Sequence, residues 1–149
     1  MDEIDRCIIS ELQRDARTSY AELGRKVGLS APAVTERVRR LENEGIVTGY
    51  HAHVDPGAAG RTIVAFVRMT SPPELGARLS KLVIDIPEVL EFHHVTGTEG
   101  FILKVAVGSI SHLERVIAQL LPYGQTTTSI VLSSPVEWRQ IDFPEPPRK

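Results

Sequence analysis

The sequence has 149 residues, 42% of them apolar and 24% charged, with a net charge of −2, which suits one ordinary globular domain or two small ones. No apolar stretch approaches the roughly 20 residues that span a bilayer, and the acidic start MDEIDR lacks a secretory signal, so we expect a cytoplasmic protein without a membrane partner. Cys7 is the only cysteine, which excludes an internal disulfide and a cysteine-based zinc site.

The first part of the chain has the periodicity of helices. Ile4, Ile8 and Leu12 recur at helical spacing and predict a first helix that ends near the stretch QRDART. The stretch SYAE predicts the start of a second helix, because the Ser19 hydroxyl can accept from the Glu22 amide while the Glu22 side chain reaches back.

A third helix follows closely. Gly28 ends the second helix, and Ser30 is the expected N-cap of the third, with Pro32 in its first turn and Gly45 just beyond its end. Its expected buried stripe consists of Val34, Val38 and Leu41. Two helices joined by so short a turn, with one more before them, indicate a helix-turn-helix.

The stretch after Gly45 changes character twice. Residues 46–54, IVTGYHAHV, alternate in polarity and predict a short strand or wing on the helices. The stretch DPGAAGR is rich in glycine and has a proline, which is typical of a linker. We therefore expect a winged helix-turn-helix domain over residues 1–50 and a linker over 51–61.

From Thr62 onward strands and helices alternate. Strands are predicted over residues 62–70, 89–96, 101–108 and 126–133, and helices over 73–87 and 109–122. In the second helix Ser111 and Glu114 form the expected capping box. The order βαββαβ predicts an α+β protein whose C-terminal domain, residues 62–141, is ferredoxin-like. Residues 142–149 contain three prolines and predict a flexible tail.

In this arrangement both helices cover one face of the sheet. Several positions of the opposite parity are apolar all the same: Val64, Phe66, Ile102 and Ala106. An apolar exposed face indicates a partner, and a second copy of the chain is the simplest one.

Charge is concentrated between residues 14 and 40. This stretch contains seven basic residues and three acidic ones, Asp15, Glu22 and Glu36, which is a local surplus of four positive charges. The basic residues are Arg14, Arg17, Arg25, Lys26, Arg37, Arg39 and Arg40. Such a surplus is typical of a protein that binds the phosphate backbone of nucleic acids, and the alternative is a solvated helix face with mixed charges.

Across nearly its whole length the chain resembles the Lrp/AsnC, or feast/famine, family of transcriptional regulators. The resemblance rests on IDRCIISELQRDART at the start and on the later pattern of LS, RVRRLE and GIV. It implies a regulator that binds double-stranded DNA, dimerises through the C-terminal sheet, assembles further to an octamer, and senses amino acids between C-terminal domains. It implies neither an enzyme nor a cofactor.

Candidate DNA contacts lie on and beside the third helix. With its apolar stripe inward, its N-terminal half suits the major groove. Candidates for base contact are Pro32, Thr35, Glu36, Arg39 and Arg40, of which the two arginines can read guanine or bind phosphates. Candidates for backbone contact are Arg25, Lys26, Arg37 and the amide groups near Ser30 and Ala31.

The stretch VTGTEGF predicts a turn between two strands. In the resemblance the effector lies between this turn, residues Gly97, Thr98, Glu99, Gly100 and Phe101, and the last strand, with Thr126, Thr127 and Thr128. Family members usually have an acid where this chain has Gly100, while Glu99 stands one residue earlier. Either Glu99 replaces that acid or the effector differs, and a plain hairpin turn is the alternative.

Other functions are disfavoured by the same residues. A GxxG loop that clamps RNA joins two helices, whereas this one joins strands and carries the negative Glu99. His93 and His94 are adjacent on a strand, so they point to opposite faces, and we expect no metal site. No nucleophile elbow or catalytic triad is present in a credible context. An effector-independent architectural DNA-binding protein and, less favoured, an RNA-binding module remain as alternatives.

Overall fold

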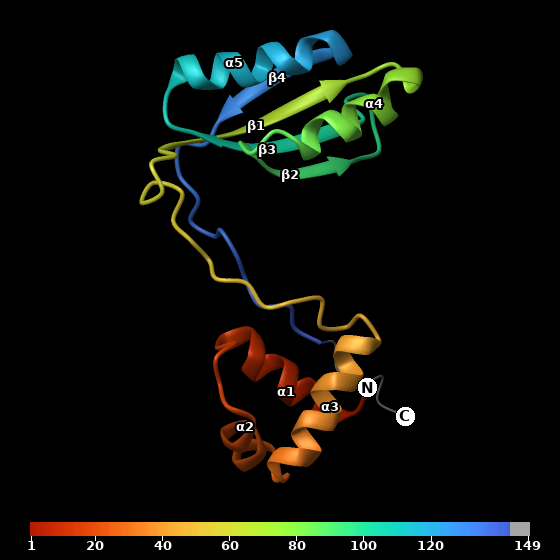
Figure 1. The fold of residues 1–149 in the computed structure, drawn as a ribbon, viewed down its shortest axis with the longest axis vertical. Coiled ribbons are helices and arrows are strands. Elements are labelled where there is room, and N and C mark those ends of the chain that lie inside the picture. Colours follow the sequence, from red (N-terminus) through yellow and green to blue (C-terminus); the bar gives the residue numbers. More distant parts are fainter. Residues whose placement is uncertain (144–149) are drawn as a thin grey trace. The chain divides into compact units, whose positions relative to one another are not determined.

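The computed structural model describes residues 1–143, which form two compact units (Figure 1). Met1–Ala52 and the described residues from Val136 onward make up the first unit. The second unit is His53–Pro135. The chain therefore passes from the first unit to the second and returns to the first.

Three helices build the first unit: α1 (Glu3–Arg14), α2 (Tyr20–Val27) and α3 (Ala31–Asn43). The predicted caps Ser19, Gly28 and Ser30 are confirmed, whereas the Glu22 side chain makes no return hydrogen bond to Ser19 within residues 1–143. Ser19 Oγ accepts from the Glu22 amide at 3.2 Å, and Gly28 ends α2 in the left-handed conformation, with φ 72°. Ser30 Oγ accepts from the Ala33 amide at 3.4 Å, so α3 begins where expected.

The core of the first unit is formed by one stripe from each helix. The predicted stripe of α3 is confirmed, since Val34, Val38 and Leu41 are fully buried. They pack with Ile8, Ile9, Leu12 and Leu23. Full burial of such a side chain contributes about 1.5–3 kcal/mol, so this cluster fixes the angle at which α3 is held.

The predicted strand after α3 is wrong. Residues 46–54 form no strand, because a strand needs a neighbouring strand to satisfy its backbone, and these residues pair with none of the strands in the part of the chain that the structure describes. The Tyr50 hydroxyl instead donates to Glu42 Oε1 at 2.9 Å. Burial and then this hydrogen bond raise the pKa of the Tyr50 hydroxyl. The segment is thus held to α3 by the side chain of Tyr50 and not by strand pairing of its backbone.

The second unit has the predicted ferredoxin-like order. Its elements are β1 (Ile63–Thr70), α4 (Pro73–Ile84), β2 (Val89–His94), β3 (Phe101–Val107), α5 (Ile110–Leu120), a 3-10 turn (Leu121–Tyr123) and β4 (Gln125–Ile130). The sheet order is β2-β3-β1-β4, and every neighbouring pair is antiparallel. Side chains of α4 and α5 pack on the same face of the sheet as Val67 and Leu103 (Figure 1).

The other face of the sheet, which we call the open face, is apolar in part. Phe66 has 40% of its surface exposed, and Val64 and Ile102 are half-buried, as the alternation predicted. Ala106, expected on the same surface, is fully buried. Its amide donates to Glu88 O at 2.9 Å, so the residues that precede β2 lie beside it in the plane of the sheet. The exposed apolar surface is therefore smaller than expected.

The described end of the chain lies against the first unit. Residues 136–141, expected in the second domain, belong to the first unit. The Gln13 side chain donates to Ile141 O at 3.1 Å and accepts from the Ile141 amide at 2.8 Å. Phe143, expected in a flexible tail, packs against the core of the first unit because it is large and apolar. The rest of that predicted tail, residues 144–149, lies outside the described residues.

Candidate DNA interface and effector site

The outer face of α3 is the side that lies opposite its buried stripe. Pro32, Thr35, Glu36 and Arg39 are exposed there. The Thr35 hydroxyl donates to Ala31 O at 2.9 Å, which leaves its lone pairs for a base or a water. This face has the length and exposure that the major groove accepts, and its one cation is Arg39.

The N-terminus of α3 offers few free amides. The Ala33 amide is occupied by Ser30 Oγ, and Pro32 has no N–H. The Ala31 amide remains, at the end of the helix where the macrodipole favours an anion. A phosphate can thus be received here, beside the exposed Ser30 hydroxyl.

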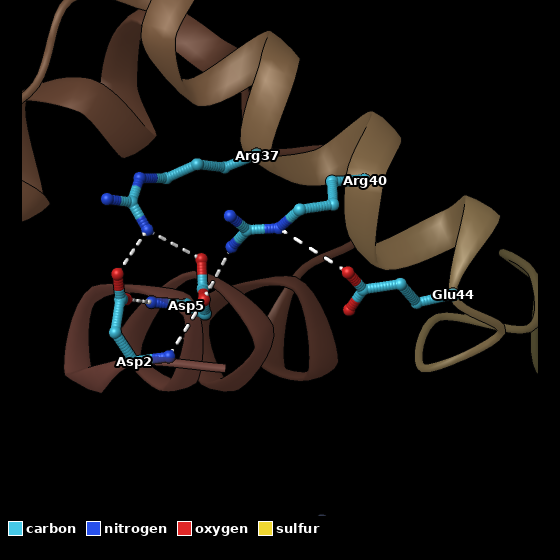
Figure 2. A network of polar contacts seen from close by, with 5 residues as sticks. All are labelled: Asp2, Asp5, Arg37, Arg40 and Glu44. Atoms are coloured by element: carbon cyan, nitrogen blue, oxygen red, sulfur yellow. Dashed lines mark hydrogen bonds and ion pairs between the residues drawn. The ribbon is translucent and has the colours of Figure 1, made fainter.

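Two of the expected DNA contacts are held by acidic side chains of α1 (Figure 2). Arg37 Nη1 lies 2.7 Å from Asp2 Oδ2 and 2.8 Å from Asp5 Oδ1. Arg40 Nη2 lies 2.7 Å from Asp5 Oδ2, and its Nε lies 3.8 Å from Glu44 Oε1. The hydrogen bonds that Arg37 donates to Asp2 and then to Asp5 raise the pKa of its guanidinium. The sequence reasoning missed this network, although DEID at the chain start has the spacing of a capping box.

Some of the other basic residues are also paired with an acidic side chain, and some are not. Lys26 Nζ lies 2.5 Å from Glu11 Oε2, and Arg14 also binds Glu11. Hydrogen bonds from Arg14 and then Lys26 lower the pKa of the Glu11 carboxyl. Arg25 and Arg39 have no ion pair within residues 1–143. The basic surplus counted along the sequence is therefore partly neutralised in space.

The turn between β2 and β3 is a hairpin, as predicted. The Val95 amide donates to Gly100 O at 2.7 Å and closes it. Gly97 and Gly100 have φ of 111° and 61°, which glycine adopts without steric cost. The sharp turn requires both residues, so their presence alone does not indicate a ligand.

Three chain segments meet at the end of β1. The Thr70 hydroxyl donates to Thr98 O at 3.2 Å, and Arg68 Nη1 lies 3.5 Å from Glu99 Oε1. Arg68 stands directly opposite Thr127 of β4, so both lie on the open face. The structure thus brings Glu99 and Thr127 next to Arg68, while Thr98 contacts Thr70 through its backbone carbonyl. The sequence reasoning missed Arg68, although its parity with Phe66 places it on this face.

Other residues expected at the effector site lie elsewhere. Thr126 and Thr128 stand opposite Met69 and Val67, which places them on the face that the helices cover. Phe101 belongs to the core, and its ring stacks on those of Phe92 at 5.4 Å and His94 at 4.8 Å between centroids. These three are positioned to hold the sheet, and a ligand on the open face does not meet them.

The histidines do not converge. His93 Nε2 lies 3.4 Å from Glu91 Oε2 on the open face, whereas His94 stacks on the opposite side, as the alternation predicted. A hydrogen bond from Lys104 is the main cause that lowers the pKa of Glu91. Within the described residues, His, Cys, Asp and Glu form no cluster of three or more that can hold a metal, and no helix is long and apolar enough to span a membrane.

Comparison with known proteins agrees with both units. Residues 1–42 match the AsnC-type helix-turn-helix domain, and residues 64–141 match the Lrp/AsnC ligand binding domain. The HTH-type transcriptional regulator LrpC of Bacillus subtilis is 36% identical over 133 residues, which cover 89% of this chain and 92% of that protein. The leucine-responsive regulatory protein of Escherichia coli is 36% identical over 124 residues, 81% of this chain and 76% of that protein.

Solved structures are similar over the same length. LrpC of B. subtilis has a TM-score of 0.87 at 35% identity and covers 93% of this chain and 99% of its own. A feast or famine regulatory protein of Mycobacterium tuberculosis, solved in complex with L-methionine, has a TM-score of 0.85 at 37% identity, covering 94% and 97%. The chain belongs to the Lrp/AsnC family and is a DNA-binding transcriptional regulator, not an enzyme.

Proposed function

We propose that the chain recognises its operator through the outer face of α3. Thr35, Glu36 and Arg39 contact base edges, with Pro32 beside them, and Arg25, Lys26 and the amides near Ser30 and Ala31 contact phosphates. The observation that carries this proposal is the exposed outer face with Arg39, which has no acidic partner within residues 1–143. Arg37 and Arg40 are instead paired with Asp5.

The second unit binds an amino acid or a related small molecule at the hairpin turn. Arg68 and Glu99 support this, because they offer opposite charges 3.5 Å apart on the open face of the sheet beside the hairpin turn. A zwitterion needs a cation for its carboxylate and an acceptor for its ammonium group. Among the relatives, one protein is named as leucine-responsive, and another was solved with L-methionine. In this chain Glu99 supplies the acceptor that Gly100 cannot.

The regulator acts in the cytoplasm as a homodimer that assembles further, up to an octamer. The open face supports self-association, because Phe66 is 40% exposed between the half-buried Val64 and Ile102. Apolar surface of this kind is stabilised when a second copy covers it. Effector binding then changes DNA affinity through a difference in binding free energy between assembly states.

DNA binding is tested by affinity for the protein's own upstream DNA over a range of salt concentrations. The wild type is expected to lose affinity with salt, and Arg25→Ala, which removes a proposed phosphate contact, to flatten the log–log slope by about 0.9. Arg39→Ala, which removes a proposed base contact, is expected to weaken operator binding by about 1–3 kcal/mol. Arg78→Ala is the matched control, because it removes one arginine from α4 in the other unit. Salt-independent or absent binding by the wild type contradicts the proposal.

The effector is tested by thermal unfolding with each of the twenty amino acids. A ligand of the native state at 100 times its Kd stabilises by about 2.7 kcal/mol, and Glu99→Gln is expected to reduce that shift. Ser111→Ala, a change on α5 outside the proposed effector site, serves as the control. If no amino acid shifts the melting temperature, the result favours the alternative function, an effector-independent architectural DNA-binding protein.

Assembly is tested by measuring the mass in solution. Phe66→Arg puts a charge on the open face and is expected to yield smaller species than the wild type. Leu132→Arg, in which the replaced side chain is 97% exposed, is the matched control. An unchanged mass for Phe66→Arg would place the interface elsewhere.

A further inference from the structure

The acidic start of α1 and the arginines of α3 form a closed set of contacts (Figure 2). Asp5 is the one fully buried charged residue of residues 1–143. Its Oδ1 accepts from Arg37 Nη1 at 2.8 Å, and its Oδ2 accepts from Arg40 Nη2 at 2.7 Å and from the Asp2 amide at 2.9 Å. The carboxylate of Asp5 is thus satisfied entirely by groups of this unit.

The two carboxylates are fixed by the helix that bears them. Asp2 is the N-cap of α1, and its Oδ1 accepts from the Asp5 amide at 2.9 Å while Asp5 binds back. This capping box holds both side chains in place, and the positive end of the helix macrodipole favours their charge. The acceptors are therefore in position before either arginine reaches them.

The pairing changes which cations of α3 are available to DNA. Asp2, Asp5 and Glu44 surround the two arginines, so the cluster carries no surplus of positive charge. To bind a phosphate instead, an arginine would leave a buried carboxylate partly uncompensated, which is strongly unfavourable. The outer face of α3 retains Arg39, and α2 retains Arg25, without such a competitor among residues 1–143.

We propose that Asp5 is a positioning residue that sets DNA specificity by holding Arg37 and Arg40 against α1 and away from the DNA phosphates. Phosphate contacts supply most of the affinity for non-operator DNA. Withholding two of them lowers that affinity and raises the ratio of operator to non-operator binding, while the outer face of α3 reads the bases. This inference rests on the proposed DNA binding through α3.

The test replaces Asp5 and measures the salt dependence of binding. Asp5→Asn keeps the shape but removes the charge, so both arginines become available to phosphates. We expect the log–log slope on non-operator DNA to steepen by up to about 1.8, or 0.9 for each arginine, and the specificity ratio to fall. Glu3→Gln is the matched control, since it removes the same charge from the same turn of α1 without contacting an arginine. A slope for Asp5→Asn equal to that of the control overturns the proposal.

A second variant, Arg40→Gln, tests the same proposal if Asp5→Asn does not fold. Arg40→Gln leaves Asp5 bound to Arg37 and to the Asp2 amide. An arginine that does not touch DNA can be removed without effect, so we expect an unchanged salt slope. A slope that flattens by about 0.9 overturns the proposal. Wild-type protein without salt-dependent binding would instead refute the proposed DNA binding itself, so the two failures are distinguishable.

Discussion

Asp2 shows how one exposed residue links the helix cap to the pH dependence of stability. Hydrogen bonds from Arg37 and then from the Asp5 amide lower the pKa of the Asp2 carboxyl from 3.8 to about 2. A carboxyl whose pKa is lower in the folded state stabilises that state while it is ionised. Its contribution is therefore complete above pH 3.8 and disappears as the pH falls through about 2.

Asp2→Asn is expected to lower the melting temperature at neutral pH. Because the carboxylate of the wild type is protonated in acid, the difference between the two proteins should shrink as the pH falls from 3.8 to about 2. Circular dichroism melts at a series of pH values measure this difference, with Glu3→Gln as an exposed acid of the same turn for comparison. A difference that is constant down to pH 2 would show that the cap acts without its charge.

Gly124 lies where β4 begins, against the end of β1. A Cβ there would stand 2.1 Å from Thr70 O, far inside van der Waals contact. Gly124→Ala should therefore shift β4 and destabilise the second unit by about 1–3 kcal/mol, as other overpacked sites do. Gly57→Ala is the control, because its Cβ would meet only the movable Asp55 side chain at 3.3 Å. Chemical denaturation compares the two, and equal stability would mean that β1 and β4 can separate without cost.

At the scale of elements, signals that act within a few residues were readable from the sequence. Ser19 and Ser30 cap α2 and α3 as predicted, and Gly28 ends α2. The hydroxyl and the left-handed glycine each satisfy backbone groups of their own turn, so their meaning does not depend on the rest of the chain. The exposed Phe66 was also predicted, because the alternation of side chains along β1 is likewise a local property of the chain.

Competing local signals were resolved only by the neighbouring elements. The predicted capping box of Ser111 and Glu114 is wrong, since Ser109 is the cap and accepts from the His112 amide at 3.1 Å. The helix begins at Ile110, within the predicted range of 109–122, because β3 already ends at Val107 and the chain turns directly into it. The predicted strand over residues 46–54 failed for lack of a partner, which alternation alone does not reveal.

Contacts between distant side chains were not readable at all. Asp5 lies 32 residues from Arg37 and 35 from Arg40, and only the packing of α1 on α3 joins them. From the sequence both arginines counted as candidate DNA contacts, since charge along a chain does not show which charges are paired. The same holds for Arg68, whose neighbours come from the hairpin turn and from β4.

At the scale of the whole molecule, the chain connects the two units twice. It leaves the first unit after Ala52 and returns to it at Val136. Thr127 of β4 faces Arg68 at the proposed effector site, and the chain from β4 continues to the segment that Gln13 binds at Ile141. A shift of β4 on effector binding would thus reach α1, the helix that holds Arg37 and Arg40 through Asp5, along the covalent chain to Ile141 and then through two hydrogen bonds to Gln13.

This route requires that residues 136–143 stay attached to the first unit, which Phe143 and Gln13 are expected to ensure. Phe143→Ala removes an aromatic ring from contact with the core and should destabilise the helical unit by about 1 kcal/mol, less than full burial would give because the ring is half-buried. Trp138→Ala is the matched control, an aromatic residue of the same segment that is 61% exposed. Because Trp138 is the only tryptophan, its fluorescence in Phe143→Ala reports release of the segment, and circular dichroism reports the helices. Equal melting curves for the two variants would mean that the segment rests on α1 without stabilising it, and the covalent route would then transmit nothing.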